Sequence, residues 1–317
     1  KSTIPNIYKN LLVNRLKNIV AGQIVLVIKN QELVLGQDID LQGVDEPLFV
    51  RIEILNDDFF TAVALGGSVG AAESYMQGHW VCADLTSLVR ILVRNSHLLD
   101  DMEGGLASLA SAAMKGIHSL RKNTKKGSRK NIAEHYDLGN DLFELFLDKD
   151  WMMYSSALYL NKQDTLEQAQ ARKLKSLCDK LYLKPSDHLL EIGTGWGGCA
   201  VFAAQNYGCK VTTTTISDAQ HEYAKNRIEQ LGLSDKITLL KQDYRELTGE
   251  YDKLVSIEMI EAVGYEYLPS FFQQCNQRLK KGGKLLIQSI TIADQRFEYY
   301  KYNVDFIQRY IFPGGFL

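Results

Sequence analysis

The sequence of 317 residues contains no apolar run that reaches the roughly 18 residues a membrane-spanning helix requires. Its first 20 residues, KSTIPNIYKNLLVNRLKNIV, lack the continuous apolar core of a secretory signal peptide, and we expect an amphipathic helix there instead. The five cysteines are odd in number, scattered, and without a C-x-x-C pair, which favours free thiols in a reducing cytoplasm. No internal repeat is visible, and we expect no metal site.

An excess of charge of either sign is also missing. The net charge is −2, so the composition as a whole indicates no binding to polyanions. Residues 101–130 differ, because between Lys115 and Lys130 there are seven Lys and Arg residues and no acidic residue. This segment is either a solvated linker or a polybasic patch for anionic lipid headgroups, where each charge contributes about 1 kcal/mol. No aromatic residues are interleaved with the charges, which disfavours a nucleic-acid-binding arm.

The first 100 residues contain a mixture of strand and helix signals, which predicts a small α+β domain with much apolar surface. The expected elements are two short strands around a turn at Asn30-Gln31, a third strand over 48–55, a helix over 57–67 that ends at its glycines, and a helix over 84–95. Asp84 is the expected N-cap of the last helix.

From residue 160 the sequence alternates between helix and strand patterns. Helices are expected over 165–183, 197–208, 217–233 and 268–283, and strands over 188–193, 210–217, 237–243, 251–260 and 284–292. Continuous apolar strands that alternate with helices form parallel sheets covered on both faces. We therefore predict an α/β, Rossmann-like domain whose ligand binds at the carboxyl ends of the strands.

The stretch LEIGTGWGG, residues 190–198, contains the pattern G-x-G-x-x-G of dinucleotide-binding turns. An NAD site also needs an Asp or Glu about 20 residues later, at the end of the second strand. That strand ends in Thr213-Thr214-Thr215-Ile216-Ser217, which offers hydroxyl groups rather than a carboxylate. Asp218 already starts the next helix, where we expect it to be the cap. The pattern alone is also compatible with a tight turn that binds no ligand.

The strand ends favour S-adenosylmethionine, which has an adenosine but no pyrophosphate. Glu191, beside the turn, is expected to face the cationic end of this cofactor. Hydrogen-bonding groups after the second strand suit its ribose or methionine part. After the third strand, Asp243 is expected to accept from the adenine amino group and Tyr244 to stack on the ring.

Several motifs in order resemble the cyclopropane-fatty-acyl-phospholipid synthase family: HYDLGNDLFELFLDKDWMMYSSALYL, LEIGTGWGG, TTISDAQ, QDYREL, EMIEAVG and YIFPGG. The resemblance implies a class I methyltransferase sheet over 131–317, a basic linker over 101–130, and an N-terminal α+β lipid-binding domain over 1–100 that is similar to sterol-carrier folds. It also implies S-adenosylmethionine as methyl donor and an unsaturated acyl chain of a membrane phospholipid as acceptor. The last two strands usual in such a sheet are missing, so we expect a C-terminal part beyond residue 317.

The resemblance also assigns residues one by one. It implies contacts with the cofactor at Tyr154, Ser155, Gly193, Gly195, Thr215, Gln220 and Tyr244. Glu261, in EMIEAVG, matches a glutamate that helps to hold a bicarbonate ion, the implied proton acceptor. Tyr310, in YIFPGG, matches a motif without an assigned chemistry.

Two positions depart from the family pattern. Ser156 stands where the family commonly has Cys, and Gln288 where it commonly has His, and in many members these two residues help to cradle the bicarbonate. Ser and Gln can still hydrogen-bond an anion, but neither titrates near neutral pH. The departures indicate either a variant that keeps the same activity or a different fate for the carbocation formed on the acyl chain.

The expected function is therefore transfer of a methylene group to the double bond of an acyl chain, which gives a cyclopropane fatty acid. Three alternatives stay open: a methyl-branched product, methylation of a soluble small molecule, and a lipid-binding protein with a degenerate methyltransferase domain. We expect a cytoplasmic protein that is peripheral to the inner face of an anionic phospholipid membrane. The oligomeric state is open, a homodimer included.

Overall fold

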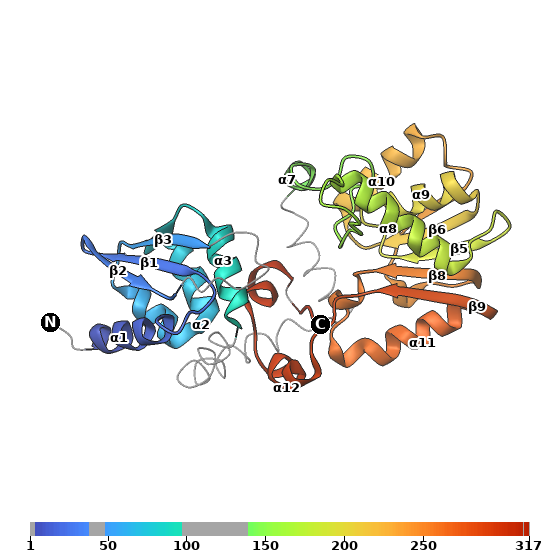
Figure 1. The fold of residues 1–317 in the computed structure, drawn as a ribbon. Helices are drawn as coiled ribbons and strands as arrows, with labels where there is room; N and C mark the ends of the chain where they lie inside the picture. Colours follow the sequence, from blue (N-terminus) through green and yellow to red (C-terminus); the bar gives the residue numbers. More distant parts are fainter. Residues whose placement is uncertain (1–3, 38–47, 97–138, 313, 317) are drawn as a thin grey trace. The chain divides into compact units, whose positions relative to one another are not determined.

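The computed structural model describes residues 4–37, 48–96, 139–312 and 314–316 (Figure 1). The described residues belong to two compact units. The first holds the residues up to Ser96 together with Tyr302–Arg309, and the second holds the residues from Gly139 to Lys301 together with those from Tyr310 onward. Within the described part of the chain, no helix is both long and apolar enough to cross a bilayer.

The first unit is a four-stranded sheet with three helices on one face (Figure 1). Its strand order is β2-β1-β3-β4, with β1 and β3 parallel and the other pairs antiparallel. The elements are α1 (Ile4–Leu16), β1 (Gln23–Ile28), β2 (Gln31–Leu35), β3 (Phe49–Ile54), α2 (Asp58–Met76), β4 (Trp80–Cys82) and α3 (Leu85–Arg94). The expected hairpin, third strand and helices are present, whereas β4 was not expected.

Two details of this unit show how local chemistry sets the boundaries. The hairpin turns at Lys29 and Asn30 rather than at the expected Asn30-Gln31, because Gln31 already pairs with Ile28. Both turn residues have positive φ, the geometry that fits a two-residue turn to the strand twist. Helix α2 does not end at its glycines as expected, because Gly67 bends the chain at φ 55 and ψ −135 and the helix then continues to Met76. Asp84 is the N-cap of α3, as predicted, and accepts from Ser87 N at 2.9 Å.

The second unit is a parallel five-stranded sheet covered on both faces. Its strands are β5 (His188–Ile192), β6 (Lys210–Thr215), β7 (Ile237–Lys241), β8 (Tyr251–Ile257) and β9 (Leu279–Gln288). Its longer helices are α8 (Leu166–Leu181), α9 (Gly198–Tyr207), α10 (Asp218–Gln230) and α11 (Leu268–Arg278). The shorter elements are α7 (Asn140–Glu144), η1 (Tyr244–Glu246), η2 (Ile260–Ala262), η3 (Tyr265–Tyr267), α12 (Asp294–Tyr302) and η4 (Ile307–Ile311). Both α12 and η4 include residues of the segment Tyr302–Arg309, which is grouped with the first unit.

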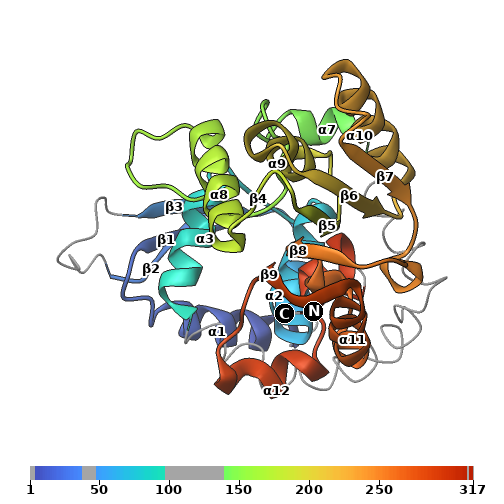
Figure 2. The same ribbon diagram turned by 90° about the vertical axis from the view of Figure 1, so that its right-hand side faces the viewer.

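The strand order is β7-β6-β5-β8-β9. The chain adds β6 and β7 on one side of β5 and then β8 and β9 on the other side, so the strand order reverses between β5 and β8. Helices α8, α9 and α10 pack on one face and α11 on the other, which Figures 1 and 2 show from two sides. The cores are continuous and apolar, with Leu189 and Leu254 fully buried. In open parallel sheets of this kind, ligands bind outside the carboxyl ends of the strands at the point of reversal.

Several expected boundaries in this unit are wrong. The strand expected over 284–292 is β9 over Leu279–Gln288, and the strand expected over 251–260 ends at Ile257. Helix α11 ends at Arg278 rather than at Gly283, because Leu279 already pairs with Tyr251 in the sheet. The N-cap of α10 is Ser217 rather than Asp218, since the Ser217 hydroxyl accepts from Gln220 N at 3.2 Å.

Candidate active site

The glycine turn follows β5 at the point of reversal. Gly193, Gly195 and Gly197 have φ values of 102, 53 and 86, a region that only glycine adopts without strain. The amides of Gly193 and Thr194 both donate to Thr214 O, at 3.2 and 3.0 Å, which joins the turn to β6. A Cβ built on Gly195 meets no atom within 4 Å, so the space beside this residue can take a ligand.

The start of α9 lies very close to the preceding loop. A Cβ on Gly198 would be 2.1 Å from Trp151 O, so this third glycine of the motif is required for packing. Trp196 is buried beside it and donates from Nε1 to Asn140 Oδ1 at 2.9 Å. Asn140 and Trp196 were not expected as site residues, although both lie in motifs that carried the resemblance.

Glu191 supports the turn from inside the sheet. Its side chain is buried, accepts from Thr213 Oγ1 at 2.6 Å, and has the Cys199 thiol as a second partner. Thr194 Oγ1 lies 2.7 Å from Thr213 Oγ1, which links the carboxylate to the turn. Burial raises the pKa of Glu191 to about 7. The predicted contact with the cationic end of the cofactor stays a prediction.

The residues predicted after β6 form a cap network. Thr215 Oγ1 donates to Gln220 Oε1 at 3.0 Å, and Ser217 N donates to Thr215 Oγ1 at 3.2 Å. Both predicted residues are buried. The T-x-S-x-x-Q pattern therefore fixes the start of α10 at the edge of the sheet where a ligand would bind, and a contact with the cofactor stays a prediction.

After β7, the predicted adenine acceptor Asp243 already has a partner. Arg245 pairs with its carboxylate through Nε at 2.8 Å and through a terminal nitrogen at 2.6 Å. Tyr244 packs edge-on against Phe271, 5.5 Å between ring centres, and burial raises its pKa to about 12. Asp243 lies after β7 as predicted, but both of its carboxylate oxygens already accept from Arg245. An adenine amino group would have to share this carboxylate with Arg245.

Tyr154, a predicted cofactor contact, is part of an aromatic cluster. Its ring lies 5.3 Å from that of Phe143, 6.0 Å from Phe146, 6.3 Å from Trp196 and 6.2 Å from Phe312. Aromatic faces attract cations, more strongly where water is excluded. The cluster is thus suited to a sulfonium or to a carbocation.

Helix α8 holds the loop that follows Tyr154. Gln170 Nε2 donates to Ser155 O at 2.8 Å, and Lys173 Nζ donates to Ser155 Oγ at 2.6 Å. Burial lowers the pKa of Lys173 to about 8, and nearby Glu258 and Asp148 partly oppose that effect. Lys173 was not expected as a site residue, because a lysine within a helix usually lies in solvent.

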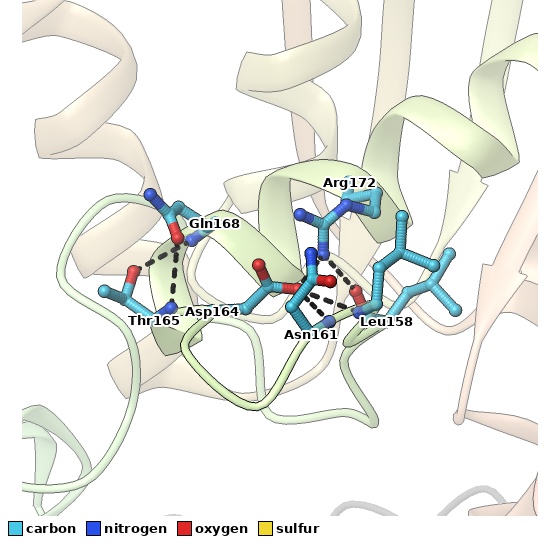
Figure 3. Close-up of polar contacts among 7 residues, drawn as sticks. Leu158, Asn161, Asp164, Thr165, Gln168 and Arg172 are labelled. Carbon is cyan, nitrogen blue, oxygen red and sulfur yellow. Dashed lines mark hydrogen bonds and ion pairs between the residues drawn. The ribbon is translucent and has the colours of Figure 1, made fainter.

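The far end of this loop is fixed by the start of α8 (Figure 3). Thr165 and Gln168 form a reciprocal capping box, with bonds of 3.3 and 3.1 Å. Arg172 pairs with Asp164 at 2.7 Å and donates to Leu158 O at 2.8 Å, and this pairing holds the pKa of Asp164 well below its usual range. The loop between Tyr154 and α8 is therefore tied down at both ends.

The structure brings Ser156 and Gln288 together, and between them lies Glu258, a residue that the sequence analysis did not single out. Ser156 N donates to Glu258 Oε1 at 2.9 Å, and Gln288 Nε2 donates to the same oxygen at 2.8 Å. Gln288 Nε2 is also 3.4 Å from Ser156 O. Glu258 directly follows β8, and its position three residues before Glu261 is the sequence signal that could have identified it.

Glu261 lies in η2, one turn further along. Its Oε1 accepts from Ile290 N at 2.6 Å, whereas Oε2 is buried and has no hydrogen-bond partner among the described residues. Burial raises the pKa of Glu261, and the nearby Glu258 carboxylate adds to that effect. A buried carboxylate oxygen without a partner is costly unless a ligand or water completes it.

A parallel sheet in this order, with a glycine turn after its central strand, is a Rossmann-like sheet of the class I methyltransferase type. The profile of the family described as mycolic acid cyclopropane synthetase matches residues 123–317. The chain therefore belongs to this family. It is 39% identical over 274 residues to the cyclopropane-fatty-acyl-phospholipid synthase of Escherichia coli (strain K12). The aligned region covers 84% of this chain and 66% of that protein.

Another relative carries a different activity in its name. The tuberculostearic acid methyltransferase UfaA1 of Mycobacterium tuberculosis is 36% identical over 269 residues, covering 79% of this chain and 60% of that protein. The chain thus spans less than two thirds of the length of these curated relatives.

Two solved structures have the same fold in part. The cyclopropane synthase MmaA2 from Mycobacterium tuberculosis aligns with a TM-score of 0.54 at 30% identity, over 59% of this chain and 68% of that one. The mycolic acid cyclopropane synthase CmaA1, in complex with SAH and CTAB, aligns with a TM-score of 0.54 at 28% identity, over 60% of this chain and 69% of that one.

A bulky side chain at Gly195 should abolish cofactor binding. Gly195→Val fills the open space beside the turn, and we expect no binding of S-adenosylmethionine in calorimetry. Gly232→Val is the matched control, because Gly232 also has positive φ and open space around its Cβ position but lies away from the sheet's ligand edge. Equal affinity in the two variants would remove the turn from the cofactor site.

Glu191 should make the stability of the fold depend on pH. Its pKa is raised from 4.5 to about 7, so the folded state keeps a proton that the unfolded chain loses, and stability falls as pH rises between those values. In Glu191→Gln, the loss of unfolding free energy between these two pH values should be smaller by about 3 kcal/mol. Urea unfolding at both ends of this pH window tests it, with Glu229→Gln, whose side chain is 56% exposed, as control. Parallel stability profiles of wild type and Glu191→Gln would contradict it.

Proposed function

We propose that this protein transfers the methyl group of S-adenosylmethionine to the double bond of an unsaturated acyl chain in a membrane phospholipid. One contact carries the proposal: a Cβ on Gly193 would lie 3.2 Å from Met259, so the glycine turn packs directly against the segment between Glu258 and Glu261. A cofactor turn and two carboxylates therefore share the ligand edge of one sheet. Family membership, and the SAH bound by CmaA1, support the cofactor.

The residues fit this cofactor. Gly193 and Gly195 have no side chains, so a ligand can approach the main chain at the turn. Tyr154 belongs to the aromatic cluster beside this turn, where its ring packs against Trp196. When bound, the cofactor supplies an electrophilic methyl group on a sulfonium. The residues of this chain then have to orient the alkene, exclude water, and stabilise positive charge on the acyl chain.

When bound, the cofactor would offer its methyl carbon to the electron pair of the alkene, so that a C–C bond would form as the C–S bond breaks, with S-adenosylhomocysteine as the leaving group. The acyl chain is now a carbocation, which the aromatic cluster and the negative charge of Glu261 stabilise. Loss of a proton from the new methyl group closes a cyclopropane ring.

A methyl-branched acyl product is the second candidate. Ser156 and Gln288 replace the family's usual residues beside the acidic pair, and a named methyltransferase of tuberculostearic acid is among the relatives. Incubation with methyl-labelled cofactor and unsaturated phospholipid vesicles, followed by lipid mass spectrometry, separates the two. A gain of one CH2 unit with no double bond left at that site supports ring closure, and a gain of CH2 with two further hydrogens supports a saturated branch. A gain of one CH2 unit with a retained double bond supports an unsaturated branch. Labelling of a soluble molecule instead of lipid would reject both.

The third alternative, a lipid-binding protein with a degenerate domain, is disfavoured by the intact glycine turn. Cofactor binding in calorimetry, the measurement used for Gly195, distinguishes it from any methyltransferase.

Glu261 should be needed for turnover but not for cofactor binding. Glu261→Gln keeps the size of the side chain and its bond from Ile290 N, but it removes the charge that stabilises the cation. We expect kcat to fall by two orders of magnitude or more, roughly the contribution of one charge aimed at a transition state. Glu250→Gln, at an exposed acid, is the control. Unchanged kcat in Glu261→Gln would remove this residue from the chemistry.

We further propose that the protein works on an anionic membrane at its cytoplasmic face. The basic segment Lys115–Lys130 lies outside the described residues, but α3 gives independent support. Leu85, Val89 and Val93 form an exposed apolar stripe along α3, and the exposed Arg90 lies beside it. A helix with this pattern can insert its apolar face among lipid headgroups and attract their charge with arginine.

Membrane binding should therefore depend on this stripe and on salt. We expect sedimentation with anionic vesicles at low salt, weaker binding with neutral vesicles, and weaker binding of Val89→Asp/Val93→Asp to both. Val34→Asp, at an equally exposed valine of β2, is the control and should bind as wild type. If the double variant and the control bind alike, α3 is not the membrane-binding face.

A further inference from the structure

Glu258 has the marks of a functional residue. It is a non-glycine residue with φ +48, a strained conformation that the surrounding structure has to enforce. It directly follows β8 at the ligand edge, and the next residue, Met259, touches the glycine turn. Its main-chain amide donates to Gln288 O at 2.8 Å, which fixes the strained position.

The carboxylate of Glu258 is held by one oxygen and leaves the other available. Oε1 accepts from Ser156 N at 2.9 Å and from Gln288 Nε2 at 2.8 Å. No described residue donates a hydrogen bond to Oε2. Two N–H donors on one oxygen fix the orientation of the carboxyl plane, and a fixed orientation toward the proton is a requirement for a group that accepts one.

The same geometry leaves no place for a dissolved anion. Bicarbonate was expected between Ser156 and Gln288, but there the amide of Ser156 and the side-chain nitrogen of Gln288 are already bound to Glu258. The carboxylate of Glu258, which already occupies these donors, would also repel an anion there. The residues of this chain therefore do not fit bicarbonate.

We propose that Glu258 is the internal proton acceptor of the reaction and takes the place of a dissolved anion. This proposal rests on the proposed function. After methyl transfer, a C–H bond beside the carbocation breaks, its electron pair forms the new C–C bond that closes the ring, and the proton passes to Oε2 of Glu258. The carboxyl then returns this proton to water once the product has left.

Three variants separate this role from a structural one. Glu258→Gln keeps the shape but cannot accept the proton, and we expect a loss of turnover of roughly a hundredfold or more, with unchanged cofactor affinity. Glu258→Gly removes the carboxylate and relaxes the strained backbone, so it should fold. Tyr182→Gly is the matched control, since Tyr182 has φ 52 at the exposed end of α8.

Activity is measured in carbon-dioxide-free buffer with bicarbonate or acetate added back. We expect wild type and Tyr182→Gly to be indifferent to both anions, Glu258→Gly to be inactive and to regain turnover with added anion, and Glu258→Gln to stay inactive because its amide still fills the site. A wild type that needs bicarbonate, or a Glu258→Gln variant with full turnover, would overturn the proposal.

A second readout does not depend on substrate. Carbon-13 bicarbonate is titrated against each protein and its bound fraction followed by NMR. Binding to Glu258→Gly but not to wild type supports the assignment, and equal binding to both overturns it. If the wild type methylates no phospholipid in the mass-spectrometric test, the proposed function fails, while this titration still decides whether Glu258 occupies an anion site.

Discussion

The close contact between Gly198 and the carbonyl oxygen of Trp151 is the constraint on which the rest of the candidate site depends. With 2.1 Å between that oxygen and a Cβ position, the first turn of α9 can lie against the loop only because it has no side chain there. Asp148 fixes the same loop by accepting from Trp151 N and Met153 N, at 2.6 and 2.9 Å. The path of the chain is therefore determined before it reaches Tyr154.

From this point the loop is directed to the acidic pair by a buried lysine. Lys173 and Gln170 bind Ser155, and the next amide, that of Ser156, then points at Glu258. An ammonium group in this position is unfavourable, since burial lowers the pKa of Lys173 to about 8. The carboxylate of Glu258 offsets part of that cost. The lysine and the glutamate are thus mutually stabilising, and neither is explained by the fold alone.

Most of the architecture of the second unit could be predicted from the sequence because its signals are local. Continuous apolar strands and the glycines after β5 are patterns that depend only on residues close together in the sequence. Boundaries failed where pairing in the sheet competed with local propensity, as at Leu279, or where two neighbouring residues could both cap a helix, as at Ser217 and Asp218.

The site was less predictable, because its decisive contacts join distant parts of the chain. Ser156 and Glu258 are 102 residues apart in the sequence, and Glu258 and Gln288 are 30 apart. A single sequence does not say which amide meets which carboxylate. It also does not reveal that Asp243 is already paired with Arg245, or that Gln220 accepts from Thr215 within a helix cap.

A proton acceptor that is part of the chain has a consequence that a dissolved anion lacks. Oε1 of Glu258 is held by two donors and its backbone by Gln288, so Oε2 cannot follow the substrate. The C–H bond that is broken is then selected by where the acyl chain lies in relation to this fixed oxygen. If the new methyl group lies nearest, the ring closes. If a carbon of the chain lies nearest, its proton leaves and a double bond forms in place of the ring. Under the proposed role of Glu258, the identity of the product therefore depends on how the acyl chain is positioned rather than on the methyl transfer itself.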